Sequence, residues 1–264
     1  MILGLVQGLT EFLPVSSSGH LVLSQKLLGI DDQGVTFEVM VHFGTLLSVV
    51  IYFWKPLWRM LLSILPPFRE DLSKDRKTIG YLAIASVPAA IVGFSPLRAL
   101  FESVYEKPAV VGLLLIVTGV VLFLPRLLIR KKREGIEGKE IGVLSAIVMG
   151  IGQAFAILPG ISRSGSTIVS GMLSGVKPSA AAEFSFLMAI PAIAAAALLE
   201  MKDLPTGDGL LLNYVLGAGV AFVSGLIAIF TVLAAIRKGK FEYFGIYCLI
   251  AGAAAFLYFR QVGA

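Results

Sequence analysis

The sequence predicts an all-α polytopic membrane protein. Hydrophobic residues make up 57% of the 264-residue chain and charged residues only 15%, with a mean hydropathy of +0.88. Soluble domains usually carry about 25% charged residues, so this composition is typical of an integral membrane protein. Several apolar stretches approach the roughly 20 residues that a helix needs to cross the hydrocarbon core, and the alternating pattern of barrel strands is absent.

Six apolar runs are predicted to be transmembrane helices. They cover residues 37–54, 79–95, 108–126, 181–199, 211–236 and 241–259. Two further apolar regions, 1–28 and 142–176, are each interrupted by a loop rich in Pro, Ser and Gly. Hydrocarbon offers the backbone of such a loop no hydrogen bonds, so each region is expected to form a re-entrant helix pair enclosed by protein or beside a wet cavity.

The two interrupted regions are related by sequence. Aligned without a gap, the identical pairs include Gln7 with Gln153, Ser16 with Ser162, Ser18 with Ser164, and Gly19 with Gly165. Glu11 is paired with Ile157 instead, and His20 with Ser166. Residues 80–91 also match residues 225–236 at seven of twelve positions. We therefore expect one integral membrane domain, 1–264, made of two repeats of about 1–130 and 140–264.

Charge bias between the helices predicts their orientation. Lysine and arginine cluster in three connections, 55–77, 126–139 and 237–240, whereas 31–32 and 200–210 lack this excess. Basic connections stay in the cytoplasm, which sets the orientation of the chain. Each repeat has three predicted transmembrane helices, and because this number is odd the second repeat is inverted relative to the first. An inverted-topology repeat brings its broken helices together near the bilayer midplane. Glu11 and Arg163 are expected to meet there.

The first loop carries a carboxylate, hydroxyls and an imidazole. Gln7 and Glu11 lie four residues apart and so share one face of a short helix. Ionisable groups inside a membrane usually mark functional sites, so Glu11 is expected to face a cavity or a cation, with a buried ion pair as the structural alternative. The hydroxyls of residues 16–18 suit helix capping. His20 suits a nucleophile or proton shuttle, or else a structural hydrogen bond.

The second loop has the features of an anion site. Arg163 opens a predicted helix, whose free N–H groups and positive dipole end favour an anion. Its planar guanidinium binds two oxygens at once, which suits phosphate, although it could instead only neutralise Glu11. His42, in the predicted helix 37–54, is interpreted as a packed or cavity-lining residue.

These residues resemble the undecaprenyl-diphosphate phosphatase family of bacterial membrane enzymes, also known through bacitracin resistance. The resemblance rests on a (Glu/Gln)-x-x-x-Glu motif at Gln7 and Glu11, on Pro-Val-Ser-Ser-Ser-Gly-His at 14–20 and on Pro-Gly-Ile-Ser-Arg-Ser-Gly-Ser-Thr at 159–167. It continues through 37–39 and 184–191 and so covers nearly the whole chain. Family members often carry Glu where this chain has Gln7.

The resemblance implies a bacterial inner-membrane enzyme that hydrolyses undecaprenyl diphosphate to undecaprenyl phosphate and inorganic phosphate, which recycles the lipid carrier for peptidoglycan synthesis. Glu11, with Gln7 as a weaker ligand, would hold Mg²⁺ or Ca²⁺. Arg163 would bind the diphosphate, which would enter from the external face. Its expected partners in substrate binding are Ser16, Ser18, Ser162, Ser164, Gly165 and Thr167.

Two nucleophile assignments stay open, because either His20 attacks phosphorus directly or Ser17 attacks after His20 takes its proton. Three other functions are alternatives to the hydrolase. A secondary transporter or flippase of a phosphorylated lipid or small anion would share the inverted repeat. An intramembrane serine protease would use Ser17 and His20. Nucleic-acid binding is disfavoured because the basic residues cluster between membrane helices. Gly-rich helices could pack within one chain or in a homodimer.

Overall fold

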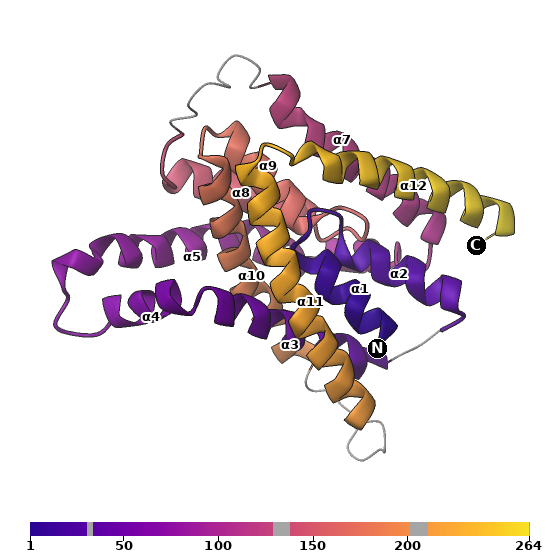
Figure 1. The fold of residues 1–264 in the computed structure, drawn as a ribbon, viewed down its shortest axis with the longest axis horizontal. Helices are drawn as coiled ribbons and strands as arrows, with labels where there is room; N and C mark the ends of the chain where they lie inside the picture. Colours follow the sequence, from indigo (N-terminus) through magenta and orange to yellow (C-terminus); the bar gives the residue numbers. More distant parts are fainter. Residues whose placement is uncertain (31–33, 129–137, 201–210, 264) are drawn as a thin grey trace.

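The computed structural model describes residues 1–30, 34–128, 138–200 and 211–263, and every named element within them is helical. Figure 1 shows these helices as one bundle. In chain order they are α1 (Ile2–Phe12), α2 (Ser17–Leu28), α3 (Gly34–Tyr52), α4 (Trp54–Ser63), the 3-10 helix η1 (Glu70–Leu72), α5 (Ser73–Gly93), α6 (Leu97–Glu102), α7 (Pro108–Leu128), α8 (Val143–Phe155), α9 (Arg163–Leu173), α10 (Pro178–Glu200), α11 (Leu211–Arg237) and α12 (Glu242–Val262).

Four of the described helices are long and apolar enough to cross a bilayer. They are the segments Pro108–Leu128, Pro178–Ala195, Leu212–Arg237 and Glu242–Val262. The pair Phe37–Tyr52 and Trp54–Ser63 passes the same test as a fifth span, but it is bent by 78° at the junction of α3 and α4. The expectation of an all-α membrane protein is thus confirmed, whereas the bend was not predicted.

The remaining predicted span, 79–95, lies in α5. This helix begins at Ser73, so its first turns carry Lys74, Asp75, Arg76 and Lys77, and it is not among the segments that are apolar enough to span. Two short helical elements in connections, η1 and α6, were also not predicted. The sequence located the apolar parts of the chain, but not where the helices extend beyond them.

Both interrupted regions form pairs of short helices, as predicted. The first pair, α1 and α2, breaks around Pro14, and the second, α8 and α9, breaks around Pro159 and Gly160. Proline has no N–H to donate, and Gly160 adopts a positive φ of 98°, which favours glycine. The helices of each pair pack against each other, so the breaks return the chain alongside itself.

Helices from the two halves of the chain pack on each other in matching combinations. Helix α1 packs along α11, and its counterpart α8 packs along α5. Helices α7 and α12 run side by side (Figure 1), with Gly112 against Gly252 and Gly119 against Gly245. Small residues allow such close backbone approach inside a membrane. The Gly-rich faces are therefore used within one chain.

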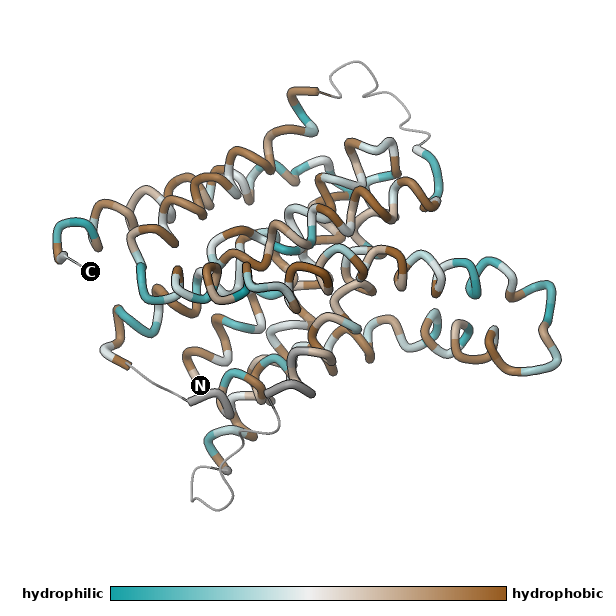
Figure 2. The backbone as a smooth tube through the Cα atoms, turned by 180° about the vertical axis from the view of Figure 1, so that it is seen from behind, coloured by the Kyte–Doolittle hydropathy of each residue, from teal (hydrophilic) through white to brown (hydrophobic). Residues whose placement is uncertain are grey.

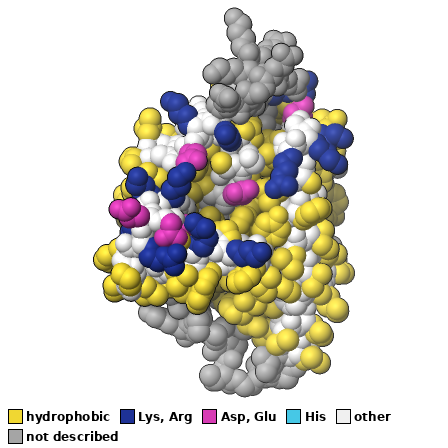
Figure 3. Space-filling view, turned by 60° about the vertical axis from the view of Figure 1, so that its left-hand side comes forward, with side chains coloured by type: hydrophobic (Ala, Val, Ile, Leu, Met, Phe, Trp, Pro, Cys, Tyr) yellow, Lys and Arg dark blue, Asp and Glu magenta, His cyan; other side chains and the backbone are white. Residues whose placement is uncertain are grey.

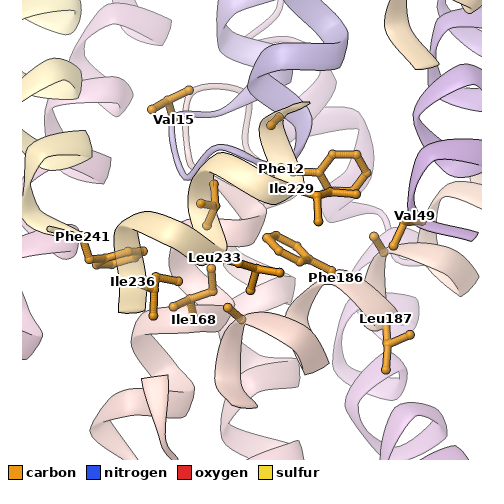
Figure 4. Close-up of a cluster of buried hydrophobic side chains, with 14 of the residues drawn as sticks. Phe12, Val15, Val49, Ile168, Phe186, Leu187, Ile229, Leu233, Ile236 and Phe241 are labelled. Atoms are coloured by element: carbon orange, nitrogen blue, oxygen red, sulfur yellow. The ribbon is translucent and has the colours of Figure 1, made fainter. Parts of the chain in front are cut away.

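A buried cluster of hydrophobic side chains lies behind the two loops (Figure 4). Phe12 of α1 and Phe186 of α10 form its centre, with ring centroids 5.6 Å apart in an edge-to-face arrangement of 84°. Ile168 of α9 and Ile229 of α11 are fully buried in the same cluster. Between helices in lipid, dense van der Waals contact of this kind supplies much of the cohesion. The cluster fixes α1 and α9 relative to each other.

The outer surface is divided by polarity. Along the backbone, apolar stretches cover most of the helices, and polar residues concentrate near helix ends such as the connection from α4 to α5 (Figure 2). Figure 3 shows lysine and arginine gathered with a few acids on one face, bordered by hydrophobic side chains. Ion pairs join charged residues at or beside helix ends, including Lys74 with Glu140 at 3.8 Å and Arg126 with Glu242 at 2.7 Å. The orientation of the helices was also predicted from the charges at 31–32, 130–133 and 201–210, and these positions lie outside the described residues.

Candidate active site

An ion pair joins the two loops at the centre of the bundle. Glu11, near the end of α1, accepts a hydrogen bond through Oε1 from Nη2 of Arg163, the first residue of α9, at 2.6 Å. The Glu11 side chain is 7% exposed and that of Arg163 16%, so both charges are largely withdrawn from solvent. The expected meeting of Glu11 with Arg163 is confirmed. It is equally the contact that a purely structural ion pair requires.

The second oxygen of the Glu11 carboxylate is also engaged. Ser17 Oγ donates to Glu11 Oε2 at 2.6 Å, and Gln7 Nε2 donates to the same oxygen at 2.9 Å. Gln7 Oε1 is buried and has no hydrogen-bond partner among the described residues. A buried amide oxygen without a partner is unusual in a native structure and points to a ligand or an ordered water. The Glu11 carboxylate thus accepts hydrogen bonds from a hydroxyl, an amide and a guanidinium.

Equivalent serines cap the second helix of each pair. Ser16 Oγ accepts from Gly19 N at 3.3 Å, and Ser162 Oγ accepts from Gly165 N at 3.0 Å. The capping alternative for the first-loop hydroxyls is therefore confirmed for Ser16, and Ser162 caps its own helix in the same way. Ser16 also has a positive φ of 70°, a conformation that costs a non-glycine residue about 1–3 kcal/mol and tends to persist at functional sites.

The two loops are tied to each other and to a third helix. Gly160 N donates to Ser16 Oγ at 3.2 Å, and Ser164 Oγ donates to the Leu13 carbonyl at 3.1 Å. Thr118 of α7 donates to the Gly160 carbonyl at 2.8 Å and accepts from the amide N–H of the second capping serine at 3.0 Å. These bonds satisfy backbone groups that lipid would leave unpaired. They also hold the loops in one fixed register.

A pocket of about 270 Å³ opens beside the ion pair. Its polar lining comes from both loops and comprises Thr10, Glu11, Ser16, Ser17, Ser18, Ser162, Arg163 and Ser164. Apolar residues complete it, namely Ala156, Ile157, Ile161, Ala192 and Ile193. The structure thus brings together seven of the residues predicted for catalysis or substrate binding. Thr10 is the further polar loop residue in this lining.

Two polar residues from outside the loops also line the pocket. His42 of α3 belongs to the lining, in agreement with its interpretation as a packed or cavity-lining residue, and its Nδ1 bonds the Glu38 carbonyl at 2.7 Å. Tyr105, from the connection before α7, was not predicted. Nothing in its local sequence marks it, because only the tertiary fold carries that connection to the pocket.

Three of the residues predicted for catalysis or substrate binding, His20, Gly165 and Thr167, do not line the pocket. His20 Nδ1 bonds the Ser16 carbonyl at 2.8 Å, and His20 Nε2 bonds the Tyr247 hydroxyl of α12 at 2.7 Å. Both ring nitrogens are therefore occupied by groups other than Ser17. Gly165 and Thr167 are buried, and their polar groups are used within the loop, with Thr167 Oγ1 also 2.6 Å from Ser185 Oγ. Substrate contact by Gly165 and Thr167 stays a prediction, since neither residue is part of the pocket lining.

Comparison with protein families bears directly on this arrangement. Residues 1–254 match the family model described as "Bacitracin resistance protein BacA", which covers both loops and all the pocket residues. The chain belongs to this family. Within the BacA family, undecaprenyl-diphosphatase of Rhodopirellula baltica is 40% identical over 256 residues, which cover 96% of this chain and 94% of the relative.

Further BacA relatives show the same coverage. Undecaprenyl-diphosphatase of Moorella thermoacetica is 39% identical over 253 residues, covering 96% of this chain and 94% of its own length. Undecaprenyl-diphosphatase 1 of Bacillus cereus is 38% identical over 264 residues, covering 98% and 96%. The similarity to these BacA proteins is therefore not confined to the two loops but extends through the helices that support them.

Proposed function

We propose that this protein hydrolyses undecaprenyl diphosphate to undecaprenyl phosphate and inorganic phosphate and so recycles the lipid carrier for peptidoglycan synthesis. One observation carries the proposal: a hydroxyl, a carboxylate and a guanidinium from two distant loops converge in one pocket with an apolar wall. These are the groups that phosphoryl transfer needs to attack phosphorus and to stabilise its oxygens. The names of the BacA relatives state the same activity.

Ser17 is the nucleophile in this proposal. Its hydroxyl lines the pocket and already donates to Glu11 Oε2 at 2.6 Å, so the carboxylate is placed to take the proton as Oγ attacks the terminal phosphorus. The bond to the bridging oxygen breaks, and undecaprenyl phosphate leaves. Arg163 holds the oxygens of the transferred group. Water then hydrolyses the phosphoserine, which releases inorganic phosphate and restores Ser17.

In this proposal His20 positions the first loop and does not take the proton from Ser17. Its contacts with the Ser16 carbonyl and the Tyr247 hydroxyl anchor the first loop to α12, and no described contact joins its ring to Ser17. Of the two assignments open from sequence, attack by Ser17 is retained, with Glu11 in place of His20 as the proton acceptor. The missing Ser17–His20 contact also removes the support for an intramembrane serine protease.

A divalent cation, Mg²⁺ or Ca²⁺, is compatible with the residues beside the ion pair. Glu11 and the unpartnered Gln7 Oε1 are oxygen donors of the kind that both ions prefer. The described residues contain no cluster of three His, Cys, Asp or Glu side chains, so diphosphate oxygens would complete the shell. Once bound, the ion would neutralise phosphate charge.

We infer an inverted-topology repeat with six transmembrane helices and two re-entrant pairs in the bacterial inner membrane. Three observations support it: the breaks in both short-helix pairs, the matching packing of α1 on α11 and of α8 on α5, and the charged face. With that face in the cytoplasm, Tyr105 at the pocket belongs to an external connection. The pocket then opens to the external face.

The proposal is tested by phosphate release from undecaprenyl diphosphate in detergent, with and without EDTA. The unmodified protein is compared with Glu11→Gln, Ser17→Ala and Arg163→Met. Release that is lost in all three folded variants supports the hydrolase. A folded, unmodified protein that releases no phosphate would favour the transporter or flippase alternative, which the comparisons do not favour.

A further inference from the structure

The pocket beside the ion pair has two chemically different sets of lining residues. The two loops contribute the carboxylate, the guanidinium and the serine hydroxyls, whereas the apolar wall consists of Ala156, Ile157, Ile161, Ala192 and Ile193. All five apolar residues come from the second half of the chain, at the break between α8 and α9 and in α10. A ligand that fills this pocket must therefore have both a charged part and an apolar part.

Ile157 occupies a special place in the apolar wall. In the alignment of the two repeats it is the counterpart of Glu11, and the equivalent capping bonds of Ser16 and Ser162 show that the two loops do correspond in structure. Both members of the Glu11–Ile157 pair line the same pocket. The repeat thus contributes a charge to the pocket from one loop and a branched hydrocarbon from the matching position of the other.

An aliphatic side chain facing open space beside a buried ion pair offers nothing to phosphate. It does favour hydrocarbon, because contact between apolar surfaces removes both from water. The Ile157 side chain is only partly buried and lines the cavity, whereas Ile193, which also lines it, is 5% exposed and belongs to the buried hydrophobic cluster. Ile157 is therefore the isoleucine with surface available to a ligand, and Ile193 is mainly used in packing.

The size of the pocket limits how much hydrocarbon it can take. At about 270 Å³ it lies near the lower end of the roughly 300–1,000 Å³ typical of ligand pockets. That volume suits a diphosphate with the carbons next to it, whereas the rest of a long prenyl chain must lie outside, against lipid-facing helices. Discrimination at this site therefore acts on the carbons nearest to phosphate.

We propose that Ile157, with Ala192 and Ile193, forms the subsite for the first isoprene units and sets the preference for prenyl diphosphates over diphosphates without hydrocarbon. This inference rests on the proposed function, since it assigns the lipid-binding part of the same site. Arg163 and the loop hydroxyls bind the phosphate end alone. Substitutions in the apolar wall should consequently weaken binding of the hydrocarbon end of the ligand, and substitutions of Arg163 or the loop hydroxyls should weaken binding of its phosphate end.

The test compares Ile157→Ala and Ile157→Asn with Ile151→Asn, a change on α8 at an exposed residue outside the pocket lining. Steady-state hydrolysis of undecaprenyl diphosphate is measured, together with inhibition by inorganic phosphate. One methylene contact in an apolar pocket changes specificity by about 10–200-fold, so KM should rise about tenfold or more in both Ile157 variants. The kcat and the phosphate inhibition constant should stay within about twofold, as in Ile151→Asn.

An unchanged KM in the Ile157 variants would overturn the subsite, and so would a matching loss of phosphate affinity, which indicates a general disturbance of the pocket. Equilibrium binding of a non-hydrolysable prenyl diphosphonate separates this failure from failure of the proposed function. Weaker binding in Ile157→Asn without turnover by any protein would retain the lipid subsite and reject only the hydrolase. Equal binding by the variant and the unmodified protein would reject the subsite itself.

Discussion

Glu11 and Arg163, 152 positions apart in the chain, share an ion pair of 2.6 Å that joins α1 to α9. Each end of the pair is held by further bonds. Ser17 and Gln7 donate to the carboxylate, while Arg163 Nη1 donates to the Ser185 carbonyl of α10 at 3.3 Å. The pair therefore links the chemistry of the pocket to the stability of the bundle.

Removal of either partner of this ion pair should abolish activity and destabilise the fold. A largely buried charge left without its partner costs about 3–5 kcal/mol, so Glu11→Gln and Arg163→Met should each lower the thermal unfolding temperature in detergent. The double variant should recover part of that loss, because no unpaired charge remains, but it should not recover phosphate release. A double variant that is no more stable than the single variants would contradict a direct coupling of the two residues.

Ser17 and His20 should differ in how their loss affects catalysis. Ser17→Ala removes the proposed nucleophile and should reduce kcat by at least about 10³-fold with little loss of stability. His20→Gln should act mainly through stability and loop position, and Tyr247→Phe, which removes only the hydroxyl that His20 contacts, should share its phenotype in milder form. Trapping of radiolabelled phosphate on the protein with a denaturing detergent quench at neutral pH, which preserves both phosphoserine and phosphohistidine, distinguishes the two residues. Label on a histidine would show that His20 is the nucleophile.

The amide at Gln7 should determine how strongly the site holds a divalent cation. Gln7→Glu adds a second carboxylate next to Glu11 and should lower the Mg²⁺ concentration needed for half-maximal activity, since hard cations prefer charged oxygens. Without metal the same variant should be less stable than the unmodified protein, because two carboxylates repel each other.

Gln7→Leu is the matched control, as it removes the unpartnered Oε1 and the bond to Glu11 together. Its half-maximal Mg²⁺ concentration should rise. A thermal-shift titration with Mg²⁺ and with Ca²⁺ gives a second reading that does not depend on turnover. Identical titrations for all three proteins would exclude Gln7 from the metal site.

Close packing between the halves predicts opposite effects for two glycine substitutions. In Gly150→Ala, the new Cβ of α8 would lie 2.5 Å from the Ala85 carbonyl oxygen of α5, an overlap that should cost about 1–3 kcal/mol. Gly219→Ala in α11 meets no atom within 4 Å in the described structure, so the change should be neutral or stabilise the helix by about 0.5–1 kcal/mol. Thermal unfolding in detergent measures both. Equal effects would show that the α5–α8 contact is looser than described.

Much of the architecture could be predicted because hydrophobicity and helix-breaking residues act locally. Pro14 and the Pro159–Gly160 pair marked the two breaks, and the long apolar runs became α7, α10, α11 and α12. The bend between α3 and α4 and the early start of α5 were not predicted. Arg59 of α4 pairs with Asp75 in the first turn of α5 at 2.9 Å, a contact that no local sequence pattern shows. Such effects depend on neighbours in space.

The sequence by itself determined the membrane character of this protein, the two broken-helix loops, their internal relationship and the residue types that suit a phosphorylated ligand. Only the tertiary structure decided which of those residues share a pocket. In the folded protein Ser17 is hydrogen-bonded to Glu11, and His20 is hydrogen-bonded to Tyr247. Thr167 contacts Ser185 and does not line the pocket, whereas His42 and Tyr105 do line it. The physical reason is that composition and spacing fix which groups a helix or loop carries, whereas the direction of a side chain depends on the hydrogen bonds and packing offered by helices distant in sequence.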